Sequence, residues 1–241
     1  MSSAQSQIAN RRPLAIGHRG APDEAPENTL ASFRRALALG VDAIELDVRV
    51  TRDGMPVVIH DSTLGRLTGR PGRVTGETWR EIRTRRVGGT EPIPRLGDVL
   101  AICRGRTMVQ IEIKAGVPVV PVIRAVRRAR ATSGVILASF SLRILQEAKK
   151  QAPFIPRMLI ANRRASVHAL ARQLAQLGAA GLSIDYRVLI SRPASIRFFQ
   201  SRGYSVWAWT VNHRRVMRHL AALSIDGILS DYPARLKQVL P

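Results

Sequence analysis

Short apolar runs alternate along the chain with amphipathic stretches of helical period. The runs have the length of buried strands, and the stretches between them repeat apolar positions every three or four residues. This pattern predicts eight strands, at residues 14–18, 43–48, 107–114, 134–140, 157–160, 179–184, 204–210 and 226–230. It also predicts eight helices, at residues 28–39, 96–104, 118–131, 141–151, 165–177, 192–202, 213–222 and 232–240.

Eight strands that alternate with helices over 241 residues are typical of a (β/α)8 TIM barrel, and we expect residues 1–241 to form one such domain. The alternative is a doubly wound open sheet, but no GxGxxG motif follows the first predicted strand. One segment interrupts the alternation. Residues 61–95 are rich in Gly and Arg, so we expect a short insertion after strand two that is too polar to hold a core of its own.

The chain is strongly basic, because 38 Lys and Arg against 17 Asp and Glu give a formal net charge of +21. Such a charge suits nucleic acid or an anionic lipid surface. No zinc-finger, helix-turn-helix or aromatic RNA-binding motif accompanies it, so a solvated Arg-rich surface is the simpler interpretation. With either interpretation, the field of the protein favours anionic substrates.

The sequence also bears on location and on the one cysteine. No run approaches the roughly 18 apolar residues that a membrane-spanning helix needs. The first residues, MSSAQSQIANRRP, lack the charged and apolar regions of a secretory signal, so we expect a cytoplasmic protein. Cys103 cannot form an intrachain disulfide and is expected to pack in the core.

Acidic residues stand inside two predicted strands, in DAIELDVRV and in VQIEIK. Because strand side chains alternate, Glu45 and Asp47 share one face of their strand, and Glu112 and Lys114 share one face of theirs. All four lie late in their strands, where a barrel builds its active site. Three carboxylates that converge there repel one another unless a cation lies between them. Oxygen ligands without cysteine suit Mg²⁺ or Ca²⁺ better than Zn²⁺.

A buried ion-pair network is the alternative to a metal site. In such a network Arg19, Arg49 and Lys114 would neutralise the carboxylates without an ion. A single buried carboxylate would favour the network. Three carboxylates in phase on adjoining strands favour the divalent ion.

Two histidines are expected at the same end of the barrel. His18 ends the first predicted strand, and Arg19 beside it can bind an oxyanion through its planar guanidinium. His60 follows the TRDG turn. A two-residue turn would place His60 opposite Asp47, and a four-residue loop would place it opposite Glu45. An odd-length loop would break this arrangement.

Two imidazoles, a divalent ion and two cationic side chains together fit phosphate-ester cleavage. One histidine can accept a proton from the attacking hydroxyl while the other protonates the leaving oxygen. The ion and the Arg and Lys side chains stabilise the charge that builds on the phosphoryl oxygens. Trp209, near the end of the seventh strand, either lines the pocket or packs in the barrel. Ser139 lacks the GxSxG elbow of a serine nucleophile.

Several segments together resemble the glycerophosphodiester phosphodiesterase family. They run in order from residue 17 to residue 233: GHRGAPDEAPENT, ELDVRVTRDGMPVVIHD, QIEIK, ASFS, WAWTVN and DGILSDYP. The resemblance implies a barrel with an insertion after strand two, and a divalent cation as cofactor. It also implies hydrolysis of glycerophosphodiesters to sn-glycerol 3-phosphate and an alcohol, and so a part in glycerol and lipid metabolism.

The resemblance further implies a role for each matching residue. These roles are acid–base catalysis by His18 and His60, metal binding by Glu45, Asp47 and Glu112, phosphate binding by Arg19 and Lys114, and bracing of the first loop by Glu27.

Two alternative functions stay open. An enzyme of the same architecture could cleave lysophospholipid head groups at an anionic membrane, on which the Arg-rich insertion would dock. A barrel without activity could bind nucleic acid or another polyanion through its charge. The complete set of site residues favours an enzyme with a small phosphodiester substrate, and we expect no specific nucleic-acid partner.

Overall fold

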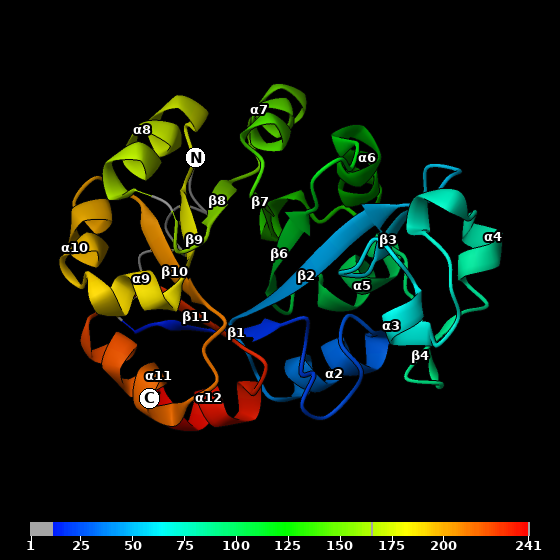
Figure 1. Ribbon diagram of the computed structural model, residues 1–241, viewed down its shortest axis with the longest axis horizontal. Helices are drawn as coiled ribbons and strands as arrows, with labels where there is room; N and C mark the ends of the chain where they lie inside the picture. The colour runs from blue at the N-terminus through cyan, green and yellow to red at the C-terminus, as the bar shows by residue number, and fades with distance from the viewer. Residues whose placement is uncertain (1–11, 165, 241) are drawn as a thin grey trace.

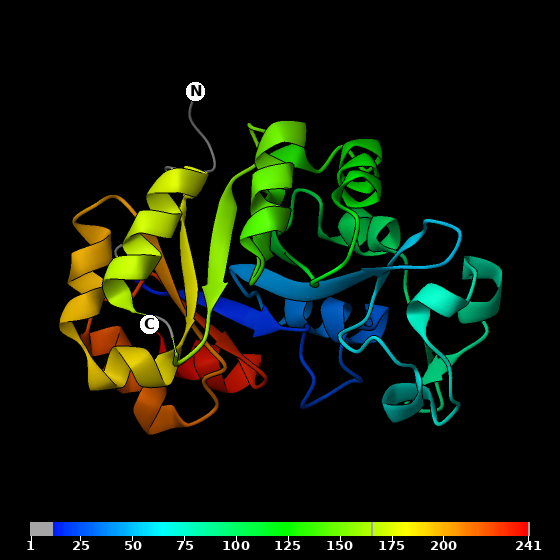
Figure 2. The same cartoon turned by 45° about the horizontal axis from the view of Figure 1, so that its top comes forward.

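Eight parallel strands form a closed barrel in the computed structural model, which describes residues 12–164 and 166–240. Figures 1 and 2 show the strands around the centre with helices outside them. Neighbouring barrel strands follow the order of the chain, and the first strand pairs with both the second and the last. The barrel strands are β1 (Leu14–His18), β2 (Ala43–Val50), β6 (Met108–Ile113), β7 (Val135–Ser139), β8 (Arg157–Ala161), β9 (Gly181–Asp185), β10 (Ser205–Trp209) and β11 (Gly227–Ser230).

Helices connect these strands and complete the predicted (β/α)8 barrel. Each predicted strand and each predicted helix overlaps an element of the structure, with bounds that differ by at most three residues. The outer helices are α2 (Leu30–Ala38), α5 (Leu96–Cys103), α6 (Val119–Arg128), α7 (Leu142–Gln151), α8 (Val167–Leu177), α10 (Ala194–Gln200), α11 (Arg214–Ala222) and α12 (Pro233–Val239). Two short additions are η2 (Thr132–Gly134) before β7 and α9 (Tyr186–Ser191) after β9.

Alternation along the strands separates two apolar regions. On β2, Ile44 and Leu46 face outward and pack under the helices, together with Cys103, which is 1% exposed as the packing role predicts. The first residue on the inner face of β2 is Ala43, which belongs to the apolar core inside the barrel together with Trp207. Further along the same inner face the residues become acidic. The inner face of β2 is therefore apolar at its amino end and acidic at its carboxyl end.

The insertion after strand two is better packed than expected. β3 (Pro56–Val58) precedes it and pairs antiparallel with β2. The insertion itself contains α3 (Gly65–Thr68), η1 (Val74–Gly76), α4 (Trp79–Ile82), β4 (Arg86–Val87) and β5 (Glu91–Pro92). The expectation that it holds no core is wrong. A small apolar cluster lies under it, formed by Val57, Ile59, Leu64, Val74, Ile82, Val87 and Ile93. Most of these residues stand singly among polar neighbours, so no apolar run marked them in the sequence.

Two predictions about organisation and location are not decided by the fold. None of the helices within residues 12–164 and 166–240 combines the length and the apolarity that crossing a bilayer requires. The cytoplasmic location stays a prediction, as does the single domain over residues 1–241.

Candidate active site

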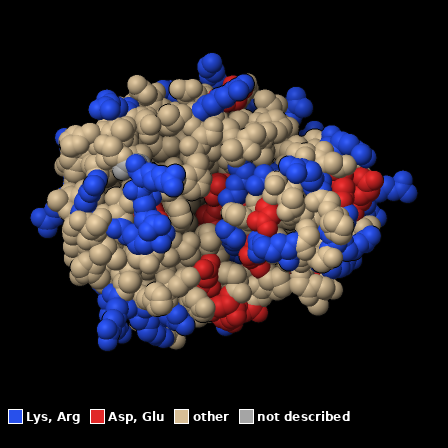
Figure 3. Space-filling model, viewed as in Figure 1, with Lys and Arg blue, Asp and Glu red and all other residues tan. Residues whose placement is uncertain are grey.

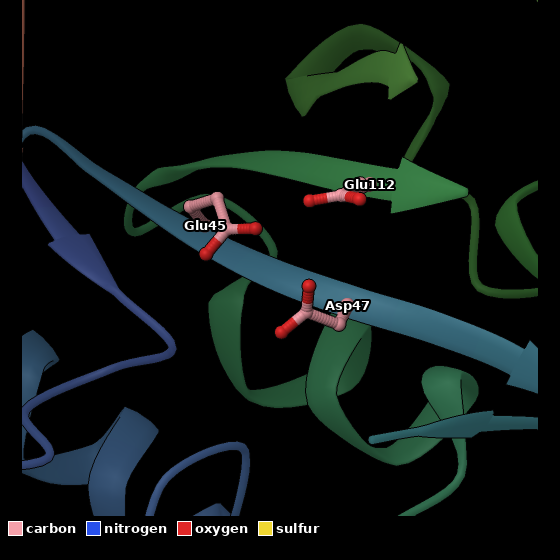
Figure 4. Close-up of side chains that lie close together, drawn as sticks. All are labelled: Glu45, Asp47 and Glu112. Carbon is pink, nitrogen blue, oxygen red and sulfur yellow. The ribbon is translucent and has the colours of Figure 1, made fainter. Parts of the chain in front are cut away.

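Three carboxylates lie close together at the carboxyl end of the barrel (Figure 4). Glu45 and Asp47 come from β2, and Glu112 comes from β6, where it stands in register with Asp47. One oxygen of each carboxylate lies within 4.8 Å of the others, and all three residues are buried. The structure thus brings together the three residues that the sequence predicts to converge.

Cationic and amide groups surround Asp47. Lys114 Nζ lies 2.7 Å from its Oδ1, and Arg19 Nε lies 3.2 Å from its Oδ2. Asn28 Nδ2 donates a hydrogen bond of 2.8 Å to Oδ2. Burial by itself favours the neutral acid, but the charges of Lys114 and Arg19 outweigh it and lower the pKa of Asp47. Asp47 is therefore ionised in its buried position.

Glu45 and Glu112 are compensated less well than Asp47. Burial and the charge of Asp47 raise the pKa of Glu45 to about 7, although its carboxylate accepts the Arg19 backbone N–H at 3.2 Å. The same two causes raise the pKa of Glu112, although Lys114 Nζ donates to it at 2.6 Å. Three carboxylates thus share two cationic side chains, an arrangement that favours a further cation.

The carboxylate oxygens fit a divalent cation. The three carboxylates are buried with oxygens within 4.8 Å of one another, although Lys114 Nζ also lies 2.7 Å from Asp47 Oδ1. Carboxylate oxygens are the ligands that Mg²⁺ and Ca²⁺ prefer in proteins. The ion-pair alternative is partly right, because Arg19 and Lys114 do contact the cluster. Arg49, its third member, instead donates from Nε to the His60 carbonyl oxygen at 2.8 Å.

His18 reaches the carboxylates from the end of β1. Its Nε2 lies 3.8 Å from Glu45 Oε2, and its Nδ1 lies 2.6 Å from Asp231 Oδ1. Burial lowers the pKa of this imidazole, but the hydrogen bond to Asp231 and the charge of Glu45 outweigh burial. The pKa of His18 is therefore raised.

The loop that follows β1 takes an unusual backbone path to direct side chains at Asp47. Arg19 and Asn28 have φ angles of 56° and 59°, in the left-handed region that residues other than glycine seldom adopt. At Gly17 a Cβ atom would lie 2.4 Å from the Gly20 carbonyl oxygen, so the turn requires glycine there. Such uncommon backbone conformations are frequent at functional sites.

His60 reaches the site, but not through the register that the sequence predicts. Val48 pairs with Val58, which leaves a three-residue loop at 52–54, so an extended ladder would place His60 opposite Leu46. The prediction that His60 faces Glu45 or Asp47 across the ladder is therefore wrong. Because β3 ends at Val58, His60 lies beyond the strand, and its side chain does not follow the alternation of the strand. It lines the same cavity as His18.

The His60 imidazole, like that of His18, contacts a carboxylate. His60 Nδ1 lies 2.7 Å from Asp61 Oδ1, and Arg66 Nε donates to Asp61 Oδ2 at 2.5 Å. Burial lowers the pKa of His60 by more than the nearby carboxylates raise it. The hydrogen bond from Arg66 lowers the pKa of Asp61 to about 2. The two site histidines thus have pKa values that shift in opposite directions.

Glu27 links the loop after β1 to the insertion. It accepts hydrogen bonds from Arg19 Nη1 at 3.0 Å and from Arg66 Nη2 at 2.8 Å. Burial would raise the pKa of Glu27, but Arg66 and Arg19 outweigh it and lower the pKa. This position suits the bracing role that the sequence predicts for Glu27.

A cavity of about 150 Å³ lies between these side chains. Its polar lining includes His18, Arg19, Glu45, His60, Gln110, Glu112 and Lys114, and its apolar lining includes Phe140, Ile160, Trp209 and Leu229. Trp209 both lines the cavity and packs, because its ring meets the Phe140 ring edge-on with centroids 5.8 Å apart. A larger hollow of about 590 Å³ opens at the amino end of the barrel, far from this chemistry, and different residues line it.

Sequence reasoning missed five polar residues that contact the site. They are Asn28, Asp61, Arg66, Asn212 and Asp231. Asn212 and Asp231 lie within the segments WAWTVN and DGILSDYP, just after the last two strands. The rule that barrel sites gather at the carboxyl ends of strands would have singled out both residues.

Comparison with known proteins identifies the family. The model of the glycerophosphoryl diester phosphodiesterase family matches residues 18–235. A glycerophosphodiester phosphodiesterase of Caldanaerobacter subterraneus subsp. tengcongensis is 33% identical over 238 residues, which cover 93% of this chain and 96% of that protein. A probable glycerophosphodiester phosphodiesterase 2 of Mycobacterium tuberculosis is 34% identical, with 94% of this chain and 90% of that protein covered.

Solved structures agree with the sequence relatives. A putative glycerophosphoryl diester phosphodiesterase from Silicibacter pomeroyi matches with a TM-score of 0.87 at 30% identity, over 97% of this chain and 96% of that one. A phosphodiesterase from Oleispira antarctica, solved with the product sn-glycerol-3-phosphate, matches with a TM-score of 0.86 at 26% identity, over 95% and 96%. The chain described here therefore belongs to the glycerophosphoryl diester phosphodiesterase family and is a phosphodiester hydrolase.

Proposed function

We propose that this enzyme hydrolyses glycerophosphodiesters to sn-glycerol 3-phosphate and an alcohol, with His18 and His60 as the acid–base pair. One observation carries the proposal: both imidazoles line a single small cavity together with Glu45 and Glu112. The family and the product bound to the Oleispira antarctica relative support the substrate class. The family also favours an enzyme over the non-enzymatic polyanion binder.

In this proposal the cationic side chains hold the phosphate and the imidazoles move protons. Arg19 and Lys114 line the cavity and would stabilise the charge that develops on the phosphoryl oxygens. One imidazole would take the proton of the attacking hydroxyl at its free nitrogen as the hydroxyl oxygen forms a new bond to phosphorus. The bond from phosphorus to the leaving oxygen then breaks, and the other imidazole would give that oxygen a proton.

Glu45, Asp47 and Glu112 would hold one divalent cation, for which Mg²⁺ and Ca²⁺ are the candidates. The support is the proximity of their oxygens, the burial of all three residues and the raised pKa of Glu45. Such a cation, when bound, supplies Lewis-acid stabilisation of a phosphoryl oxygen.

Release of glycerol 3-phosphate from a panel of diesters tests the proposal. The panel contains glycerophosphocholine, glycerophosphoethanolamine and glycerophosphoglycerol, each with EDTA-treated enzyme and with added Mg²⁺ or Ca²⁺. We expect release that stops on chelation and returns with one or both ions. Activity that survives exhaustive chelation would remove the role of the metal. If no diester releases glycerol 3-phosphate with any cation, the proposed substrate class is wrong.

A second candidate is the cleavage of lysophospholipid head groups at a membrane surface. The insertion was expected to provide the basic docking surface. In the structure, three of its arginines are paired, Arg66 with Glu27 and Asp61, Arg85 with Glu77, and Arg95 with Asp98. Five others are exposed: Arg70, Arg73, Arg80, Arg83 and Arg86. The paired arginines have less free charge to offer a membrane.

Another part of the barrel mouth also fits a membrane surface. The segments after β7, β8 and β9 lie side by side because these strands are neighbours in the sheet. Phe140 and Ile190 are 46% and 38% exposed there, and the side chain of Arg163 is 64% exposed although its Nε lies 3.8 Å from Asp185 Oδ2. Figure 3 shows basic side chains around a hollow near the centre of this face, with acidic side chains inside the hollow. Exposed apolar groups next to arginines suit an anionic bilayer.

Co-sedimentation with vesicles tests this second candidate. We expect binding to phosphatidylglycerol-containing vesicles at low salt, weaker binding to pure phosphatidylcholine, and at least about tenfold weaker binding after the double substitution R163Q and I190S. The matched control is R127Q with F154S, because Arg127 lies over the exposed Phe154 ring at the amino end of the barrel. Equal losses in both double variants would show that binding depends on overall charge and not on the mouth.

A further inference from the structure

A carboxylate outside the metal cluster contacts the His18 imidazole. Strand β11 pairs with β1 so that Ser230 stands opposite Gly17. Asp231 follows Ser230 directly after β11, and His18 follows Gly17 at the end of β1. Asp231 Oδ1 lies 2.6 Å from His18 Nδ1. The two residues are 213 positions apart in the chain, so the closure of the barrel creates this contact.

Asn212, after β10, holds Asp231 through both ends of its amide. Asn212 Nδ2 donates to Asp231 Oδ2 at 2.7 Å. Asn212 Oδ1 accepts the Asp231 backbone N–H at 3.0 Å and the Ser230 hydroxyl at 3.2 Å. These two donors determine which end of the amide carries the oxygen, so the Nδ2 group must face the carboxylate. One carboxylate oxygen of Asp231 is thus fixed by Asn212, and the other is directed at His18.

We propose that Asp231, held by Asn212, is a positioning residue that fixes the tautomer and the orientation of His18. An ionised carboxylate only accepts hydrogen bonds, so neutral His18 carries its proton on Nδ1 and its lone pair on Nε2. Nε2 is the nitrogen on the side of Glu45, 3.8 Å away, where the cavity lies. Asp231 therefore presents the correct nitrogen to the site through the other side of the ring. This inference rests on the proposed acid–base role of His18.

The alternative is that Asp231 merely stabilises the turn between β11 and α12. A comparable contact elsewhere argues against it. His60 Nδ1 also lies close to a carboxylate, at 2.7 Å from Asp61 Oδ1. Asp61 is the next residue after His60, and it is not part of the turn that contains Asp231. Both site histidines thus have a carboxylate at Nδ1. A positioning function explains this recurrence, whereas turn stabilisation explains only one case.

Kinetics of Asp231 variants with glycerophosphoethanolamine and Mg²⁺ provide the first test. D231N keeps the shape of the side chain, but its amide can present N–H to Nδ1 and so favours the wrong tautomer. We expect kcat to fall by roughly 10²–10⁴-fold while KM changes by less than about threefold. D231E, which restores a carboxylate, should recover at least about tenfold of that loss. A D231N enzyme with the wild-type kcat would overturn the inference.

The matched control is D226N at the opposite end of β11. Like Asp231, Asp226 accepts a hydrogen bond from a side-chain amide, Gln200 Nε2 at 3.1 Å, and it accepts the Val206 backbone N–H at 2.7 Å, but it lies at the amino end of the barrel. D226N is expected to keep the wild-type kcat even where it lowers the melting temperature. Should D226N lose as much kcat as D231N at equal stability, the effect is structural and the inference fails.

Nitrogen NMR of the wild-type imidazoles gives a test that needs neither turnover nor a variant of Asp231. In protein labelled with ¹⁵N-histidine, the His18 signals are assigned by their loss in H18Q. We expect neutral His18 to be protonated on Nδ1, and a proton on Nε2 would overturn the inference. If no diester is cleaved but the Nδ1–H tautomer is found, the proposed function fails while the positioning contact stands.

Discussion

Lys114 Nζ lies 2.7 Å from Asp47 Oδ1, in a pair whose side chains are 11% and 1% exposed. The same ammonium group donates to Glu112 at 2.6 Å. Burial lowers the pKa of Lys114, but the two carboxylates outweigh it and raise the pKa. Lys114 is therefore charged where it contributes to holding the carboxylate cluster together, and it lines the cavity in which the phosphate is proposed to bind.

Replacement of Lys114 by methionine should destabilise the protein. K114M leaves two buried carboxylates with less positive charge, and breaking a buried pair of this kind costs about 3 kcal/mol or more. Urea unfolding in the presence of EDTA measures the loss. K150M is the control, because Lys150 is exposed and its replacement should change the free energy of unfolding by less than about 0.5 kcal/mol. Equal stability of K114M and wild type would contradict this account of the cluster.

Binding of a divalent cation should release protons and should strengthen as the pH rises. Burial and Asp47 raise the pKa of Glu45 to about 7, so near pH 6.5 a large share of Glu45 carries a proton that a cation must displace. Raising the pH through 7 removes that proton beforehand, and the affinity for the cation increases. Calorimetric titration with Mg²⁺ in two buffers of different ionisation enthalpy counts the protons. An affinity that does not change between about pH 6 and pH 8 would contradict a proton on Glu45 that the cation displaces.

Removal of either imidazole should abolish most of the activity without unfolding the protein. H18A and H60A are each expected to lower kcat at least ~100-fold, the usual scale of acid–base catalysis. The control is H219A, because His219 is exposed on α11. Glycerol 3-phosphate release, with thermal unfolding as the check on folding, measures the effect. A near wild-type rate for H18A or H60A would refute the role assigned to that residue.

Loss of the Glu27 carboxylate should weaken substrate binding more than it slows chemistry. E27Q removes the charge that holds Arg19 and Arg66 together, so Arg19 becomes less well oriented toward the phosphate. We expect KM to rise by about three- to tenfold with kcat within about threefold of wild type. Steady-state kinetics on a soluble diester measure both parameters for E27Q and wild type. A fall in kcat at unchanged KM would instead place Glu27 in the chemical step.

Much of this architecture was predictable because barrel strands and helices have distinct periods. Glu45, Asp47 and Glu112 were found because polar residues on the inner face of an apolar strand are conspicuous, and because adjoining strands share a register. His18 was found for a similar reason, since it ends the first strand. These inferences need only local alternation and the rule that sites lie at the carboxyl ends of strands.

Other features depend on geometry that local patterns do not specify. The register of β3 depends on the length of the loop that joins it to β2. This loop has three residues, 52–54, and the turn residues in the sequence did not reveal an odd length. The contact between Asp231 and His18 requires β11 to meet β1, which only the closed barrel provides. The apolar cluster of the insertion is assembled from isolated residues such as Leu64 and Ile82, which no run of apolar residues announces.

Anomalous scattering from crystals soaked in Mn²⁺ tests the central claim most directly. Manganese takes the same oxygen ligands as Mg²⁺ and can be located without reference to activity. The account predicts one strong peak at the carboxyl end of the barrel, within roughly 2.5 Å of an oxygen of each of Glu45, Asp47 and Glu112. The account is contradicted if saturating Mn²⁺ gives no peak among these three carboxylates. It is also contradicted if the peak is coordinated by other residues.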